Sequence, residues 1–218
     1  MADWSPLWLS LRVATLATLA AAVGGILIGY LLAEGRFAGR GALESLLTLP
    51  LILPPTVLGY YLLVALGRQS ALGALFECIT GVPLVFTWQG AVVAATIPAL
   101  PYVIRTARAS FEGIESSVRE AARIDGASRL QLFWGIALPL ARRGITAGVT
   151  LAFARALGEF GATLMVAGNI PGRTQTMPIA IYDAVSAGRW EAATVMVLVL
   201  SAVAVVVLMI TGRLGAAA

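Results

Sequence analysis

The sequence contains no histidine and no lysine, and its 218 residues include a single cysteine, Cys78. Without histidine the chain lacks the commonest general base and metal ligand of proteins. One cysteine can form neither an internal disulfide nor a thiolate metal cluster. The Walker A motif of ATPases needs a lysine, so this chain cannot contain it. These absences argue against a membrane-embedded enzyme and against ATP hydrolysis by the chain itself.

Charged residues are also scarce, at 12% of the chain, whereas apolar residues make up 59% and the mean hydropathy is +0.90. A soluble domain carries about 25% charged residues, so lipid must cover much of this surface. We expect an all-α membrane protein built as a single transmembrane domain over residues 1–218. All 15 basic residues are arginines that flank apolar runs and form no continuous basic stripe, which argues against a nucleic-acid partner.

Apolar runs predict where the chain crosses the membrane, because a spanning helix needs about 20 apolar residues. The sequence predicts a polytopic bundle of five transmembrane helices. The third run begins with residues, to about Leu84, that are typical of a loop, and the fourth is interrupted by Arg155 and Glu159. The five runs are Val13–Ala33, Ser45–Gly67, Cys78–Ile104, Gly144–Gly168 and Ala192–Gly212.

The arginines divide unequally between the loops on the two sides of the membrane. Cytoplasmic loops are the ones that carry an excess of basic residues. If residues 105–143 are cytoplasmic, four arginines lie on the opposite side, namely Arg12, Arg68, Arg173 and Arg189. The cytoplasmic side then holds ten, namely Arg36, Arg40, Arg105, Arg108, Arg119, Arg123, Arg129, Arg142, Arg143 and Arg213. This predicts an inner-membrane protein with its amino terminus outside and its carboxyl terminus in the cytoplasm.

A polar segment, "EAARIDGASRLQLFWGIALP" (Glu120–Pro139), interrupts the apolar chain. Ser117 and Ser128 each stand three residues before a Glu or Gln, the spacing of a capping box, and each predicts a helix start. Gly126 suits the end of the first helix, where a positive φ is needed. The sequence therefore predicts two short helices joined at a glycine.

The end of this segment predicts the start of the next span, because Pro139 lacks an N–H that would be unpaired there in any case. Ala121 and Ala122 leave the first short helix with a shallow surface that another backbone can approach closely. The segment is thus predicted to dock a partner. An amphipathic connector that rests on lipid headgroups is the alternative.

The same residues resemble the EAA loop of bacterial ABC importer permeases, in which Glu-Ala-Ala, three residues, a glycine, nine further residues and Ile-x-Leu-Pro follow one another. In that family the loop forms a coupling helix that sits in a cleft of the cytoplasmic ATPase subunit. The resemblance implies a type I importer permease fold, a coupling-helix loop over about residues 109–139 and an ATPase subunit dimer that binds ATP and Mg. The ATPase-coupling residues it implies are Glu120, Ala121, Ala122, Asp125, Gly126, Ala127, Leu138 and Pro139.

Two further stretches, Leu47–Leu63 and Phe153–Tyr182, are similar to molybdate permeases. Sulfate permeases share a related Gly-Glu-Phe-Gly and Gly-Asn-Ile core, so sulfate stays open as the alternative substrate, and tungstate is expected beside molybdate. The resemblance implies a homodimer with the anion path between the copies, supplied by a molybdate-binding protein outside. No cofactor is expected in this chain. A secondary transporter would show internal repeats, and no convincing repeat is found.

Prolines lie inside two predicted spans and predict kinks, since each removes a backbone donor. Pro50, Pro54 and Pro55 lie in the second span, and Pro98 and Pro101 in the third. Membrane helices tolerate such breaks where they line a cavity or are buried in protein. A bent pathway or gate and a kink needed only for packing are equally open interpretations.

Charged residues in the fourth span predict a gate or subunit interface. Arg155 and Glu159 are spaced i, i+4, so they can pair on one helical face, and an unpaired charge in the membrane is costly. A structural ion pair that closes the bundle is the alternative. Thr56 and Thr163 offer neutral hydroxyls to a passing oxyanion, although such hydroxyls usually bond back to their own helix.

Small residues around Glu159 predict close helix approach, at Gly158, Gly161, Ala162 and Gly168. The following segment, Gly168–Trp190, is too polar and broken to span the membrane. We expect a loop and short helix at the outer face, where the resemblance implies contact with the binding protein.

Overall fold

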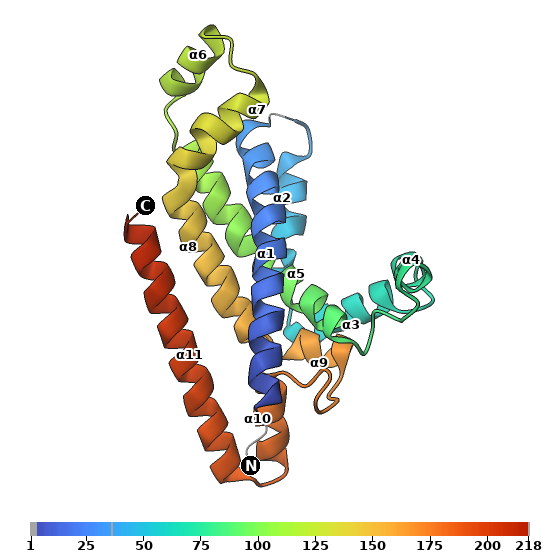
Figure 1. Cartoon of the computed structure of the whole chain (residues 1–218). Helices are drawn as coiled ribbons and strands as arrows, with labels where there is room; N and C mark the ends of the chain where they lie inside the picture. Colours follow the sequence, from blue (N-terminus) through green and yellow to red (C-terminus); the bar gives the residue numbers. More distant parts are fainter. Residues whose placement is uncertain (1–3, 36, 218) are drawn as a thin grey trace.

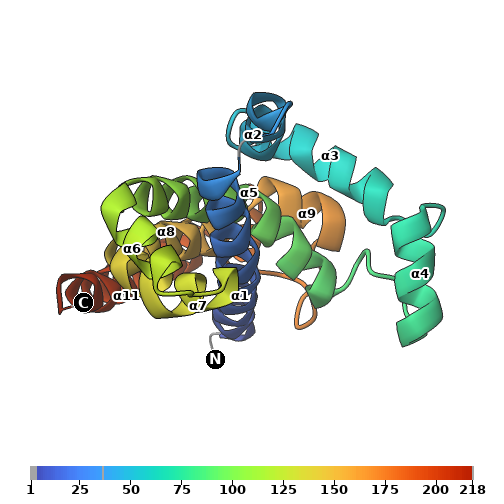
Figure 2. The ribbon, with the colours of Figure 1, turned by 90° about the horizontal axis from the view of Figure 1, so that it is seen from above.

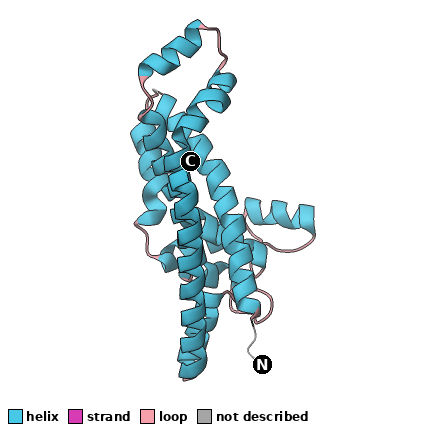
Figure 3. Cartoon of the chain, turned by 60° about the vertical axis from the view of Figure 1, so that its left-hand side comes forward, coloured by secondary structure: helices cyan, strands magenta, loops and turns pink. Residues whose placement is uncertain are grey.

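Long apolar runs fold into long helices, and no strand occurs in the part of the chain that the computed structural model describes, residues 4–35 and 37–217 (Figure 1; Figure 3). The predicted all-α fold is confirmed. The helices are α1 (Ser5–Glu34), α2 (Arg40–Thr48), α3 (Pro55–Leu66), α4 (Ala71–Thr80), α5 (Trp88–Glu112), α6 (Ser116–Ile124), α7 (Arg129–Leu132), α8 (Leu138–Leu157), α9 (Gly161–Ala167), α10 (Met177–Ser186) and α11 (Trp190–Ala217).

Four helices are long and apolar enough to cross a membrane: Ser5–Glu34, Trp88–Glu112, Arg129–Leu157 and Trp190–Thr211. A fifth crossing exists only as a broken span, because the chain bends by 111° between Arg40–Leu51 and Pro55–Leu66. The described residues therefore support four spans, or five when the bent pair counts as one. The number of predicted spans agrees with the upper value.

The second predicted span, Ser45–Gly67, is not one kinked helix. A 3₁₀ turn, Leu49–Leu51, follows α2 and contains Pro50, and the chain then leaves the helix before α3 begins. Pro54 precedes α3 and Pro55 opens it, which is where a missing N–H costs nothing. The prolines thus end one helix and begin another, and Figure 2 shows α3 turned away to the side of the bundle.

Two other predicted spans have different boundaries. The third run, Cys78–Ile104, includes the end of a separate helix, α4, and the spanning helix begins at Trp88 and continues to Glu112 with Pro98 and Pro101 buried inside it. The fourth run, Gly144–Gly168, is broken at Gly158, where α8 has ended and α9 has not begun. A short polar Gly-Glu sequence is enough to stop the helix.

The bundle packs around α5, which lies between α1 and α8 (Figure 1; Figure 2). Small residues let these helices approach closely: a Cβ added at Gly25 of α1 would lie 2.6 Å from the Cβ of Val103 in α5. A Cβ added at Gly148 of α8 would collide with the Thr106 hydroxyl of α5. Close glycine contacts thus replace large interlocking side chains, as is common between membrane helices.

The two ends of the bundle differ. The α6–α7 segment projects at one end, named the α6 end, whereas α10 and the start of α1 lie at the other, named the α10 end (Figure 1). α4 stands off the side of the bundle in both views and carries Cys78, whose side chain is exposed (Figure 1; Figure 2). α11 packs against α8 and α10.

Candidate functional site

The α6–α7 segment forms the helix–glycine–helix unit that the sequence predicts. Gly126 has a φ of +81°, and the backbone N–H of Ala127 donates to the Ala122 carbonyl at 2.9 Å, which closes the end of α6. Ser128 and Gln131 form the predicted capping box: the Ser128 N–H donates to Gln131 Oε1 at 2.8 Å, and the Gln131 N–H donates to Ser128 Oγ at 3.3 Å. The joint and the second helix start are confirmed.

The first predicted cap is wrong. α6 begins at Ser116, so Ser117 lies within its first turn, and its hydroxyl donates to Glu115 Oε2 at 3.1 Å instead of capping the helix. Pro139 lies in the first turn of α8, as predicted, but the span begins earlier, because α7, the π turn and α8 follow one another directly from Arg129 to Leu157. A wide π turn, Phe133–Ala137, precedes Pro139, and the Leu138 N–H donates to the Phe133 carbonyl there.

The α6 helix has an open face and a packed face. Glu120, Ala121 and Asp125 are exposed, and Ile124 is 85% exposed although its side chain is wholly apolar. Ala122 was predicted on the open surface, but it is buried in the cluster of α5 and α7–α8 side chains. Only one of the two neighbouring alanines therefore remains available to a partner, because successive helical residues point in different directions.

The predicted coupling residues do not form one patch. Glu120, Ala121, Asp125 and Gly126 share the exposed tip of the α6–α7 unit, and Ala127 is partly buried beside it. Leu138 is half-buried and Pro139 exposed beyond the π turn. These two groups of predicted coupling residues are far apart in the sequence because α7 and the π turn lie between them.

An arginine joins α6 to two long helices. Arg119 Nη1 lies 2.6 Å from Glu34 Oε1 at the end of α1, and Arg119 Nη2 donates to the Phe111 carbonyl near the end of α5. Both charged side chains are about four-fifths buried, at 18% and 22% exposure. The sequence analysis missed this contact because no local spacing relates position 119 to position 34.

Aromatic rings pack together next to the Phe111 carbonyl that Arg119 contacts. Tyr30 of α1 packs edge-on against Phe111 at a centroid distance of 5.2 Å and against Phe133 at 4.7 Å. The same cluster contains Ala122 of α6. The α6–α7 unit therefore rests on a packed apolar base that includes residues of both α1 and α5.

A second set of ion pairs joins α2 to α5 at the same end. Glu112 Oε1 lies 2.6 Å from Arg40 Nη2 and 2.8 Å from Arg108 Nε, and Arg108 also pairs with Glu44. The chain between α1 and α2 is short, and these ion pairs additionally hold α2 against the end of α5. Arg40 and Arg108 are two of the ten arginines that the sequence predicts on one side of the membrane, and both lie at this end.

The predicted ion pair of the fourth span is present, but not on one helix. Arg155 Nη1 lies 2.6 Å from Glu159 Oε2, and Glu159 lies beyond the last residue of α8. Glu159 Oε1 also accepts the Ala162 N–H at 2.8 Å in the first turn of α9. The carboxylate thus connects the end of α8 to the start of α9, and it is fully buried.

The two stretches that resemble molybdate permeases meet where α9 packs against α3. A Cβ added at Gly161 would lie 2.7 Å from Pro55 Cβ, and one added at Gly59 would lie 2.7 Å from Met165 Cβ and 3.0 Å from Ala162 Cα. The predicted close approach is confirmed at Gly161 and Ala162.

The other two small residues behave differently from each other. Gly168 has a φ of +74°, and a Cβ there would lie 3.1 Å from the Phe86 ring, which belongs to the loop before α5, so Gly168 packs closely but not against another helix. Gly158 has no close neighbour from another helix and instead follows the end of α8. Its predicted role in helix packing is therefore wrong.

The predicted pathway residues differ in how exposed their side chains are. Pro54, Pro55 and Thr56 are exposed at the start of α3, and Arg155 is partly exposed. Thr163 is buried, and its hydroxyl donates to the Phe160 carbonyl at 2.9 Å, as hydroxyls in membrane helices usually do. In this conformation the α3 residues are therefore accessible at the surface of the chain, whereas Thr163 and Glu159 are not.

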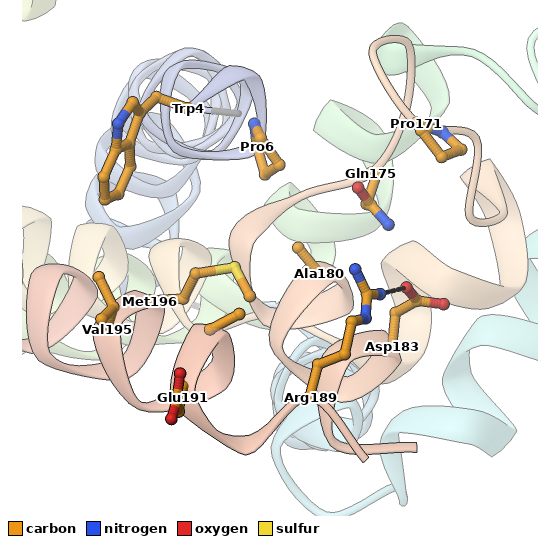
Figure 4. Close-up of a pocket in the computed structure, with 11 residues that line it drawn as sticks. Trp4, Pro6, Pro171, Gln175, Ala180, Asp183, Arg189, Glu191, Val195 and Met196 are labelled. Atoms are coloured by element: carbon orange, nitrogen blue, oxygen red, sulfur yellow. Dashed lines mark hydrogen bonds and ion pairs between the residues drawn. The ribbon is translucent and has the colours of Figure 1, made fainter. Parts of the chain in front are cut away.

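The α10 end carries a cavity of about 660 Å³ between the starts of α1 and α11 and the α10 region (Figure 4). Asp183 and Arg189 form an ion pair at 2.7 Å in its wall, and Glu191 lies on the α11 wall (Figure 4). Trp4 lines it from the start of α1. The predicted loop and short helix over Gly168–Trp190 are confirmed as the α9–α10 loop and α10.

Residues 25–216 match the family model of the binding-protein-dependent transport system inner membrane component. The chain belongs to this family. ModB of Escherichia coli K12, a molybdenum transport system permease protein, is 41% identical over 210 residues, which cover 96% of this chain and 92% of that protein. ModB of Haemophilus influenzae is 43% identical over 175 residues, 80% of this chain and 76% of that protein.

A sulfate permease is also similar to this member of the binding-protein-dependent family. Sulfate permease 2 of the Chlamydomonas reinhardtii chloroplast is 38% identical over 196 residues, which cover 90% of this chain but 53% of that protein. The chain is a multi-pass membrane protein of a transport system, and its role as a translocation subunit agrees with the prediction that it is not an enzyme.

Solved structures show the fold of this family member. A chain of the inward-facing MetNI methionine ABC transporter superposes with a TM-score of 0.76 at 18% identity, covering 100% of this chain and 99% of that one. A chain of the bacterial alginate ABC transporter, solved with its alginate-bound periplasmic protein, gives 0.75 at 16% identity over 96% of this chain and 76% of that one. The predicted type I ABC importer permease fold is confirmed.

Proposed function

We propose that this chain is the membrane-spanning subunit of an ATP-driven importer that carries molybdate, and tungstate beside it, into the cytoplasm. The observation that carries the proposal is the 41% identity to a molybdenum permease over 96% of the chain. That likeness includes both the α6–α7 unit and the α3–α9 contact, so it extends to the two parts of the molecule that transport would use.

The exposed tip of α6 supports docking of a cytoplasmic ATPase. Ile124 is 85% exposed, and the exposed Glu120 and Asp125 flank it, so the tip of α6 offers a partner an apolar side chain between two carboxylates. A dimer of ATPase subunits would bind ATP and Mg and hold one α6 of each permease copy. Movement of α6 would then reach α1 and α5 through Arg119 and the aromatic base.

A homodimer is supported by the position of α3. Its start lies beside α9 and exposes Pro54, Pro55 and Thr56, and further along it Tyr60, Tyr61 and Val64 are more than half exposed. A second copy packed against this side would cover the apolar residues and leave the anion path between the two chains. Arg155 and Glu159 would then act as a gate, because their ion pair joins α8 to α9.

The α10 end would face the periplasm and receive the molybdate-binding protein. The cavity of Figure 4 and the paired Asp183 and Arg189 supply a polar surface for such a partner. The arginine excess at the α6 end supports the same orientation, with the carboxyl terminus in the cytoplasm and the chain in the inner membrane.

Sulfate is the second candidate substrate, because a sulfate permease is 38% identical over 90% of this chain. Uptake of labelled molybdate into vesicles that hold this chain, its ATPase and its binding protein tests both substrates. We expect uptake to require hydrolysable ATP and to be blocked by tungstate but not by excess sulfate. Equal competition by sulfate would contradict the assignment of molybdate as the preferred substrate. Uptake with a non-hydrolysable ATP analogue would contradict the role of the α6–α7 unit.

A further inference from the structure

A second cavity at the α10 end has positive and neutral polar groups among the apolar residues of its wall. It has a volume of about 660 Å³ and lies between α1, the segment before α5 and the α9–α10 loop. Arg12 and Arg173 line it, together with the polar side chains of Thr87, Gln89 and Thr174. No acidic residue is among the described residues of its wall, in contrast to the cavity of Figure 4, where acids and an arginine meet.

The two arginines have no acidic partner within ion-pair distance in residues 4–35 and 37–217. The other two arginines expected on this side are already paired, Arg68 with Glu77 at 2.7 Å and Arg189 with Asp183 at 2.7 Å. The guanidinium carbon of Arg12 lies 3.7 Å from the centre of the Trp88 ring. This contact positions the cation and leaves its charge unneutralised.

One residue of the cavity wall, Phe86, has an uncommon backbone conformation. Phe86 has a φ of +60°, a conformation that residues other than glycine rarely adopt. Its N–H donates to the Val166 carbonyl at 2.9 Å, and its ring lies against Gly168. The cavity wall is therefore tied directly to the end of α9, and such strained positions cluster at functional sites.

We propose that this cavity binds a tetrahedral oxyanion through Arg12 and Arg173. Guanidinium groups donate paired hydrogen bonds that match the oxygens of such an anion. The inference rests on the proposed function for the natural anion: at the outer face, the site would hold molybdate between its release by the binding protein and its passage. Both arginines are exposed, so binding is weak and salt-sensitive, which permits onward release.

Equilibrium dialysis of radiolabelled molybdate against the full chain, in detergent free of phospholipid, tests the site. We expect Arg12→Gln and Arg173→Gln each to weaken binding about tenfold, because each removes a charge-assisted contact. Arg68→Gln is the matched control, since Arg68 does not line the cavity, and should bind as the unchanged chain does. Unchanged binding in both cavity variants, or no binding by the unchanged chain, would overturn the proposal.

The phosphate of a lipid headgroup has the same chemistry as a free oxyanion. Titration with short-chain phosphatidylglycerol separates the two sources. Competition that disappears in Arg12→Gln supports the site with lipid phosphate as its occupant, and absence of competition supports the free anion.

Uptake by the assembled transporter separates this inference from the proposed function. A higher KM for molybdate in the double variant, with ATP hydrolysis retained, supports a place for the site in transport. If the double variant keeps the KM of the unchanged transporter, the site has no such place but the proposed function stands. If the unchanged transporter does not import molybdate, the proposed function fails whatever the dialysis shows.

Discussion

The residues of the Arg155–Glu159 pair are unequally exposed: the arginine side chain is 28% exposed and the carboxylate 1%. A partly exposed arginine can turn its guanidinium toward water when it loses its partner. A buried carboxylate has no such alternative, because burying an unpaired charge is costly. The two members of one ion pair should therefore respond differently to removal.

Arg155→Gln should lower the free energy of unfolding by about 3 kcal/mol or more, because it leaves the Glu159 carboxylate buried without its cation. Glu159→Gln should cost about 1 kcal/mol, since its amide oxygen can still accept the Ala162 N–H. Thermal unfolding in detergent measures both. Equal losses would contradict the argument, and normal uptake by Glu159→Gln would remove the proposed gate.

A single methyl group tests the contact between α3 and α9. Gly161→Ala should destabilise the chain by about 1–3 kcal/mol, because its Cβ would lie 2.7 Å from Pro55 Cβ and force the two helices apart. Gly41→Ala in α2 is the control: no atom lies within 4 Å of its added Cβ, and alanine favours a helix by about 1 kcal/mol. The thermal midpoint should fall for the first variant and stay or rise for the second. The opposite order would show that α9 does not pack against α3 as described.

At the scale of helices, α6 is short, and among its described side chains Ala122 and Arg119 join it to the bundle. Nine residues alone would form a marginal helix in water. Its orientation therefore depends on contacts to α1 and α5. A helix held in this way can pass a displacement to both of these helices.

Arg119→Gln should uncouple the assembled transporter, so that the molybdate imported per ATP hydrolysed falls, because α6 loses its ion pair to Glu34. Combining Arg119→Glu with Glu34→Arg should recover part of this ratio, since the opposite charges meet again. Arg105→Gln serves as the control, because this exposed arginine makes no ion pair within the described residues. Full coupling in Arg119→Gln would show that α6 moves the bundle by another route.

Sequence patterns predicted these helices to different extents for physical reasons. The long spans follow from local apolar length, and the Gly126 joint and the Ser128 cap follow from local backbone chemistry. Helix ends were less predictable, because the apolar run continues through the break at Pro54, and Arg155 and Glu159 could equally have paired within one continuous helix across the break at Gly158. The contact between Arg119 and Glu34 depends on tertiary packing, which local spacing does not encode.

At the scale of the whole molecule, the orientation in the membrane can be tested from both ends. In a Cys78→Ser background, Ser117→Cys at the α6 end and Ser186→Cys at the α10 end place single exposed thiols on opposite sides. In right-side-out vesicles a membrane-impermeant maleimide should label position 186 and not position 117. In inverted vesicles the pattern should reverse.

Labelling of both positions from one side would contradict the proposed topology. The replaced residues are exposed serines in short helices, and cysteine differs from serine by one atom, so the fold should tolerate both changes. Detergent-opened vesicles provide the control in which both thiols react.

The exposed cysteine of α4 makes the natural chain suitable for spectroscopy. Cys78 is the only thiol in the sequence, and it lies on the helix that stands off the side of the bundle. A nitroxide attached there would report from one known position without any engineered background. In a homodimer, each copy would carry one spin, and their dipolar coupling would measure how far the two α4 helices separate during a transport cycle.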